Sequence, residues 1–292
     1  MKRPNYATDK VIKQFIKNAL EEDIQDGDHS TLSTIPKNLQ QSAKLLVKQN
    51  CILAGVELAE IIFKTFDKNL NIETFIKDGK TANVGDVAFI VTGSARSILS
   101  TERLVLNCMQ RMSGIATLTH EWDSRLIGSK TKLLDTRKTT PNFRVCEKWA
   151  VAIGGGTNHR YGLYDMIMLK DNHIDYNGSI TNAVKMAKEY VKTTKKKLKI
   201  EVETRNLEEV KETIAANVDR IMLDNMDVEM MRKAVQLING SCESEASGGI
   251  TRDQLKEIAT TGVTYISAGA LTHSAENIDL SLKAVKQLEL FS

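Results

Sequence analysis

The sequence has few cysteines and few prolines. Its 292 residues include four cysteines, Cys51, Cys108, Cys146 and Cys242, which form no CxxC pair and show no zinc-site spacing. We therefore expect reduced, buried thiols in a cytosolic protein. Only three prolines occur, and no low-complexity segment or linker stands out along the chain.

Long apolar runs and an excess of basic residues are also missing. No stretch approaches the roughly 18 apolar residues that a membrane-spanning helix needs, and the charged start MKRPNYATDK lacks the apolar core of a signal peptide. The 40 basic and 37 acidic residues leave a net charge of +3, whereas a nucleic-acid binder shows a strong basic excess. The sequence thus predicts a cytoplasmic protein that binds neither membranes nor nucleic acids.

The first third of the chain predicts a mixed α/β domain. Apolar residues recur with a helical period over residues 9–22 and 54–66. Residues 42–55 and 86–97 contain strand-like pieces. A long helical pattern runs from Ser97 to about residue 126 and is expected to span a domain boundary.

From Lys130 onward, short apolar runs alternate with helical stretches. This alternation predicts a parallel sheet with right-handed crossovers. Six such units in about 150 residues favour an incomplete (β/α) barrel. A doubly wound open sheet is the alternative. The final segment, IDLSLKAVKQLEL, is expected to be an amphipathic helix. The six strand-like runs are KLLD, DMIML, KIEVE, RIMLD, CESEA and TYISA.

Polar residues or glycine turns mark the ends of these strand-like runs. In a barrel, all of these strand ends meet at the carboxyl-terminal mouth, where such folds build active sites. Glu201 and Glu203 share one face of their strand, and only one of them is expected to reach a ligand. The residues at the ends are Thr136, Arg137 and Lys138; Lys170, Asp171, Asn172 and His173; Asp224 and Asn225; Ser247, Gly248 and Gly249; and Gly269 and Ala270.

These residue types predict a highly anionic substrate. Arg137, Lys138 and Lys170, with His159 and Arg160 on the loop GGGTNHR, concentrate positive charge in a nearly neutral protein. Two carboxylates at the same mouth would repel an anion unless Mg²⁺ lay between them, since carboxylate and phosphate oxygens are its usual ligands. The glycine turns after the last two strands suit a phosphate.

Several long motifs resemble one known family. DTRKTTP, EKWAVAIGGGTNHRYGLYDMIMLKDNH, EASGGI and SAGALTHS are closely similar to quinolinate phosphoribosyltransferase, and the similarity extends through the N-terminal part. The resemblance implies an α/β protein: an N-terminal α/β sandwich domain over residues 1–113 and a C-terminal incomplete (β/α) barrel over residues 114–274. A C-terminal helix at about 275–292 would pack back on the first domain.

The resemblance also implies roles for individual residues. Glu203 and Asp224 would hold Mg²⁺ and act with Lys138 in catalysis, with Lys138 between the two substrates. A homodimer with shared active sites is implied, and the further step to a hexamer stays open. Quinolinate would be bound by Arg137, His159, Arg160 and Lys170 with Arg103 of the neighbouring subunit, and the 5′-phosphate by Ser247, Gly248 and Gly269.

The implied reaction joins quinolinate to the phosphoribosyl group of phosphoribosyl pyrophosphate. It releases pyrophosphate and CO₂ and yields nicotinate mononucleotide, for NAD biosynthesis. A nicotinate phosphoribosyltransferase, or a barrel that binds a phosphosugar without this chemistry, is the alternative function. The sequence departs from the family's usual residues at Asn142 and Phe143 (usually Gly-Leu), Trp149 (usually Tyr) and Ala152 (commonly Arg), none of which is an implied ligand.

Overall fold

The chain folds into two compact units. The computed structural model describes residues 3–285. Within these, the first unit contains residues 3–120, 139–155 and 271–285, and the second contains residues 121–138 and 156–270. The expected division at residue 113 remains a prediction, because compactness does not test whether a segment folds independently.

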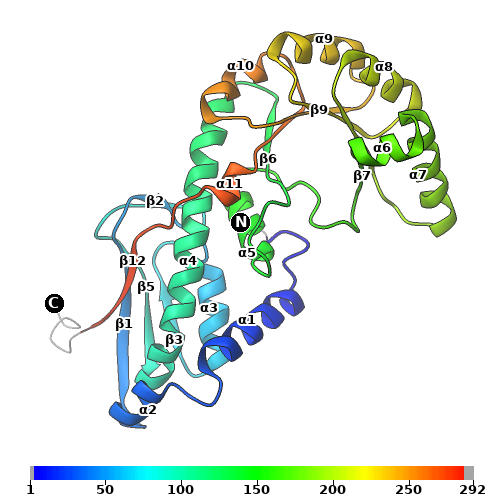
Figure 1. Cartoon of the computed structure of the whole chain (residues 1–292). Coiled ribbons are helices and arrows are strands. Elements are labelled where there is room, and N and C mark those ends of the chain that lie inside the picture. Colours follow the sequence, from blue (N-terminus) through cyan, green and yellow to red (C-terminus); the bar gives the residue numbers. More distant parts are fainter. Residues whose placement is uncertain (1–2, 286–292) are drawn as a thin grey trace. The chain divides into compact units, whose positions relative to one another are not determined.

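The first unit is built on a four-stranded antiparallel sheet (Figure 1). Its strands lie in the order β12 (Leu280–Ala284), β1 (Gln40–Val47), β5 (Val87–Ser94) and β3 (Asn71–Thr74). Leu45 and Phe89 are buried on this sheet, and the Phe89 ring meets that of Phe63 edge-on, with centroids 5.9 Å apart. The unit also contains the short pair β2 (Cys51–Ile52) and β4 (Thr81–Ala82), and helices α1 (Asp9–Ile24), α2 (His29–Thr34), α3 (Val56–Phe66), α4 (Ala95–Asp123), α5 (Arg144–Ile153) and α11 (Ala270–His273).

The last described segment corrects one expectation. Residues 280–284 form strand β12 rather than part of a helix, and β12 pairs antiparallel with β1, with Leu282 opposite Leu45. Leu280 and Leu282 are buried while Lys283 is exposed, which is the period-two pattern of a strand. The short apolar run fits both the period of a helix and the period of a strand. It forms a strand because β1 offers an edge of backbone groups with which it can pair. Residues 286–292, where the expected helix would continue, lie outside the described residues.

The second unit is a six-stranded, wholly parallel sheet. Its order is β6-β11-β10-β9-β8-β7. Strands β7 to β11 are therefore neighbours in chain order, β6 lies beside β11, and the opening of the sheet is between β6 and β7. Among the described residues no strand pairing closes β6 onto β7, but Thr157 forms a parallel bridge with Leu134 of β6. This arrangement confirms the incomplete barrel. The strands are β6 (Lys132–Leu134), β7 (Ile167–Leu169), β8 (Ile200–Thr204), β9 (Arg220–Asp224), β10 (Glu243–Ser247) and β11 (Tyr265–Ser267).

Helices follow one another around the outside of this sheet (Figure 1). The side chains of Ser179, Asn206 and Asp227 accept backbone N–H bonds at the starts of α7, α8 and α9, as expected of N-caps. No helix in residues 3–285 combines the length and apolarity needed to cross a membrane. The helices of this unit are α6 (Asp171–Asn177), α7 (Ile180–Thr194), α8 (Leu207–Ala216), α9 (Val228–Ile238) and α10 (Leu255–Ala259), with 3-10 turns at Ser124–Leu126 and Arg252–Gln254.

Candidate active site

Two arginines lie close together at the opening of the parallel sheet. Arg137 follows β6 and Arg160 follows the bridge-forming Thr157. Burial and the charge of Arg137 lower the pKa of the Arg160 guanidinium. The Arg160 Nη1 donates to the carbonyl of Met166 at 3.2 Å. Holding like charges together costs free energy, and an anionic ligand would relieve that cost.

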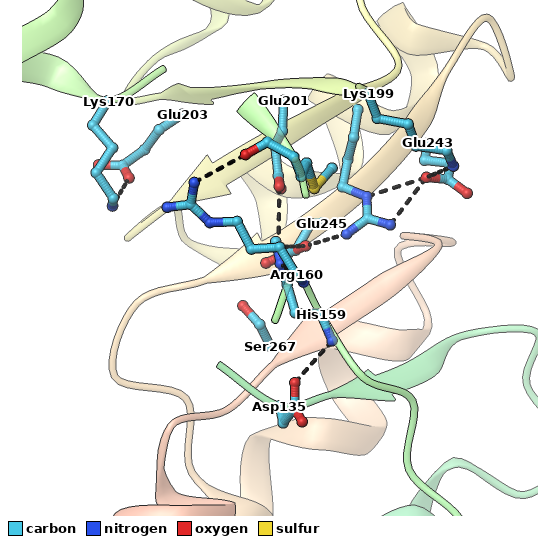
Figure 2. Close-up of polar contacts among 12 residues, drawn as sticks. Asp135, His159, Arg160, Lys170, Lys199, Glu201, Glu203, Glu243, Glu245 and Ser267 are labelled. Atoms are coloured by element: carbon cyan, nitrogen blue, oxygen red, sulfur yellow. Dashed lines mark hydrogen bonds and ion pairs between the residues drawn. The ribbon is translucent and has the colours of Figure 1, made fainter. Parts of the chain in front are cut away.

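Lys170 and Glu203 form an ion pair across the ends of β7 and β8 (Figure 2). The Lys170 Nζ lies 2.5 Å from Glu203 Oε2. The Lys170 backbone N–H donates to the Nδ1 of His173 at 3.1 Å, so His173 helps to begin helix α6. A cation expected to bind substrate and a carboxylate expected to bind metal are therefore direct neighbours.

The turns after β9 and β10 are interlocked. Asn225 has a φ of 52°, its side chain donates to Asp224 Oδ2 at 2.7 Å, and its backbone N–H donates to the Ser247 carbonyl at 2.9 Å. Gly248 has a φ of +103°, and a Cβ built there would lie 2.3 Å from Asn225 Oδ1. Only glycine fits this position, because both its backbone conformation and the space beside it exclude a side chain. Gly269 follows β11 at the same edge of the sheet.

His159 points into the sheet interior rather than toward solvent. Its Nε2 lies 3.0 Å from Glu201 Oε2 and 3.2 Å from Glu245 Oε2, and all three side chains are buried (Figure 2). Glu201 is fully buried while Glu203, two residues on, is partly exposed. Of the two carboxylates on this face of β8, only Glu203 is therefore accessible to a ligand in this arrangement.

The two carboxylates determine the charge of His159. Burial lowers the pKa of the imidazole, but the hydrogen bonds and charges of Glu201 and Glu245 outweigh it and raise the pKa to about 9. The Arg160 backbone N–H lies 2.6 Å from Nδ1 and favours the neutral ring. One peptide dipole is weaker than two adjacent carboxylates, so the ring is charged at neutral pH.

Sequence reasoning missed an ionic network beneath the strand ends. Arg220 donates from Nη1 to Glu245 Oε2 at 2.9 Å and from Nη2 to Glu243 Oε2 at 3.0 Å. Its guanidinium lies 4.2 Å from the ring centroid of Tyr265. Charged residues at alternate positions of the short strand β10 were a sequence signal for inward-pointing charge, since alternate residues share one face of a strand.

Arg103 belongs to a different compact unit from the other candidate residues. It lies on α4, in the first compact unit, whereas Arg137, Lys138, His159, Arg160, Lys170, Glu203, Asp224, Ser247, Gly248 and Gly269 belong to the second. The side chain is exposed and makes no hydrogen bond or ion pair with the residues that the structure describes.

Comparison with known families accounts for both parts of the chain. Residues 28–113 match the N-terminal domain, and residues 115–283 the C-terminal domain, of quinolinate phosphoribosyl transferase. The chain belongs to the quinolinate phosphoribosyl transferase family. The resemblance found in the motifs is thereby confirmed, as is the two-part α/β fold.

Members of the family resemble this chain along most of its length. The chloroplastic nicotinate-nucleotide pyrophosphorylase [carboxylating] of Oryza sativa subsp. japonica is 47% identical, covering 96% of this chain and 79% of its own. A mitochondrial quinolinate phosphoribosyltransferase [decarboxylating] of Nicotiana tabacum is 45% identical, covering 96% and 84%. The crystal structure of NadC from Streptococcus pyogenes superimposes with a TM-score of 0.89 at 39% identity, covering 96% of this chain and 99% of that one.

Proposed function

We propose that the carboxyl end of the parallel sheet transfers the phosphoribosyl group of phosphoribosyl pyrophosphate to quinolinate, with decarboxylation. This reaction gives nicotinate mononucleotide, CO₂ and pyrophosphate, a step of NAD biosynthesis. One observation carries the assignment of the site: basic residues and carboxylates project from successive ends of a single parallel sheet, with Lys170 and Glu203 in direct contact.

Arg137, Arg160 and Lys170 bind the two carboxylates of quinolinate, with His159 beneath them. Lys138 lies between the two substrates. The pyridine nitrogen attacks C1′ as pyrophosphate leaves, and nearby cations stabilise the departing charge. The bond between C2 and its carboxylate then breaks and releases CO₂. The electron pair stays on C2, where the adjacent positively charged ring nitrogen stabilises it, and C2 takes up a proton from solvent to give nicotinate mononucleotide. The backbone and hydroxyl groups at Ser247, Gly248 and Gly269 receive the 5′-phosphate.

Glu203 and Asp224 would hold Mg²⁺. They lie at the ends of the adjacent strands β8 and β9, and their carboxylate oxygens are the donors that this ion prefers. When bound, Mg²⁺ neutralises negative charge on the pyrophosphate oxygens. Its binding would compete with the Lys170–Glu203 ion pair, which leaves Lys170 available to an anionic substrate.

Product analysis tests the reaction. The purified protein, given quinolinate, phosphoribosyl pyrophosphate and Mg²⁺, is expected to form nicotinate mononucleotide, CO₂ and pyrophosphate. Nicotinate lacks one carboxylate and leaves a site cation unpaired, so its kcat/KM should be lower by about 100-fold or more. Equal use of quinolinate and nicotinate would instead support the nicotinate enzyme, and the absence of turnover would support a binding protein.

Calorimetry tests the two carboxylates. Glu203→Ala and Asp224→Ala should weaken binding of phosphoribosyl pyrophosphate with Mg²⁺. Quinolinate binding should persist or tighten, because each change removes negative charge from a positive site. Loss of quinolinate binding in a folded variant would contradict the separate roles proposed for these side chains.

The assembly is a homodimer in which Arg103 completes the partner's site. An exposed arginine without a partner in its own described chain supports this role, since a planar guanidinium can bind a carboxylate with two parallel hydrogen bonds.

The N-terminal domain extends to residue 113 in this proposal. Limited proteolysis that releases a stable fragment ending near that residue would support the boundary.

A further inference from the structure

The charges in the sheet interior balance without a metal ion. Two carboxylates, Glu201 and Glu245, are buried with two cations, Arg220 and the His159 imidazolium (Figure 2). The partly exposed Glu243 pairs with Arg220 and lies 3.3 Å from the Nζ of the exposed Lys199. Ligand atoms of His159, Glu201 and Glu245 lie within 4.8 Å of one another, a spacing that a metal ion could use. The charged imidazole already supplies positive charge between the two buried carboxylates, and we call these residues the ionic network.

One oxygen atom, Glu245 Oε2, contacts both buried cations of this network, Arg220 and His159. Glu245 Oε2 accepts from Arg220 Nη1 at 2.9 Å and lies 3.2 Å from His159 Nε2. Glu245 is fully buried, and Arg220 and His159 are nearly so. Ionic contacts of this kind have well-defined geometry, because a buried charge that loses its partner is strongly destabilised. Arg220 therefore fixes Glu245, and Glu245 with Glu201 fixes the imidazole.

The imidazole anchors the segment that carries Arg160. On the β6 side, Asp135 accepts the His159 backbone N–H at 2.8 Å and the Asn158 side-chain amide at 2.7 Å, beside the bridge between Leu134 and Thr157. The ring then extends from this segment into the sheet interior. The segment just before Arg160 is thereby held on two sides, by β6 through Asp135 and Leu134 and by β8 and β10 through the ring.

We infer that Glu245 and Arg220 are positioning residues for quinolinate, which hold His159 and thereby set the place of the Arg160 guanidinium. This inference rests on the proposed role of Arg160 in binding quinolinate. Neither residue touches substrate in this account. Their effect is expected to fall mainly on quinolinate, because the ring of His159 holds the segment that carries Arg160, whereas the residues proposed for the 5′-phosphate lie on the turns after β10 and β11.

Steady-state kinetics of Glu245→Gln provides the test. The variant keeps the size of the side chain but removes the charge that pairs with His159. The KM for quinolinate should rise by about ten-fold or more, as when a supporting contact of a ligand-binding group is lost. The KM for phosphoribosyl pyrophosphate should stay within about two-fold. Glu229→Gln is the control: it makes the same chemical change in an exposed ion pair with Arg232, outside this network, so both constants should change by less than about two-fold.

A pH profile separates positioning from simple loss of folded protein. In Glu245→Gln the imidazolium has lost one carboxylate, so the rise of the quinolinate KM with pH should begin at lower pH than in the unmodified enzyme. A purely structural defect would reduce activity without moving this profile. If Glu245→Gln does not fold, Arg220→Lys keeps the charge with fewer contacts and should show the same selective change, smaller in size.

Each failure has a distinct signature. If the unmodified protein does not turn over quinolinate, the proposed function is wrong. If it does, and Glu245→Gln leaves the quinolinate KM unchanged or raises both KM values equally, the positioning role alone is overturned. A stoichiometric bound metal that is lost in Glu245→Gln would also overturn it, since the cluster would then be a metal centre.

Discussion

At the scale of single residues, the structure explains how three departures from the family's usual residues are accommodated. Asn142 has a φ of 62°, a left-handed conformation that suits the usual glycine and that asparagine tolerates better than most residues. The Phe143 ring packs on that of Phe15 with centroids 5.5 Å apart, and the Arg3 guanidinium lies 5.9 Å from the Trp149 ring. Nothing in the structure explains Ala152.

The two adjacent glycines after β10, Gly248 and Gly249, should differ in how well they tolerate substitution by alanine. Gly248→Ala should abolish most activity, because its Cβ would overlap Asn225 and push apart the turns that carry Asp224 and Ser247. Gly249→Ala meets nothing within 4 Å, and its left-handed φ costs only about 1–2 kcal/mol. Assays of kcat/KM beside thermal melts of both variants check the difference. Equal activity of the two would show that the interlocked turns do not form the site.

The buried imidazolium predicts a dependence of stability on pH. The folded pKa of His159, about 9, lies above its ordinary value of 6.5. Folding thus favours the protonated ring: this contribution is complete below about pH 6.5, is lost as pH rises through about 9, and is on the order of 3 kcal/mol. Denaturant titrations across this range should show stability falling, and His159→Gln should flatten the fall. His173→Gln, which changes an exposed histidine, should keep the unmodified slope.

At the scale of elements, strand β12 should be a measurable part of the first unit's stability. Leu282→Ala should lower the free energy of unfolding by about 2–4 kcal/mol, because the side chain is buried against β1. Lys283→Ala, on the exposed side of the same strand, should change it by less than about 0.5 kcal/mol. Guanidinium denaturation compares the two variants. Equal effects would contradict the alternating burial of a strand.

The elements were predictable where a period was long or a strand end was chemically distinctive. The long helix expected from Ser97 to about residue 126 occurs as α4, and all six strand-like runs form strands of one parallel sheet. Strand β12 was not predictable, because it forms by pairing with β1, a strand far away in the sequence. Likewise, the sequence named His159 but not its orientation, which depends on Glu201 and Glu245 from two other strands.

At the scale of the whole molecule, the proposed sharing of sites between two chains predicts complementation. Arg103→Ala and Lys170→Ala should each be nearly inactive alone, since each lacks a cation for quinolinate. After the two variants exchange subunits, one site of each mixed dimer carries both defects and the other carries none. Random pairing then restores about a quarter of all sites. Activity before and after subunit exchange measures the recovery.

The control for complementation is direct detection of mixed dimers. Differently tagged variants that copurify after exchange establish that mixed dimers form. If they form and the mixture remains inactive, Arg103 acts on the site of its own chain or is not a substrate ligand.

A cytoplasmic location stays a prediction, since plant relatives are named chloroplastic and mitochondrial.

The place of β12 in the sequence also constrains how the protein is made. A ribosome delivers β1 before the whole parallel sheet, yet the strand that covers one edge of β1 is made only after that sheet. Until then β1 presents unpaired backbone groups on one side, which is the kind of edge that recruits strands from other chains. The parallel sheet is complete in sequence before β12 appears, so it can fold while the first sheet still waits for its last strand. A newly made chain therefore exposes a strand edge that the finished molecule no longer displays.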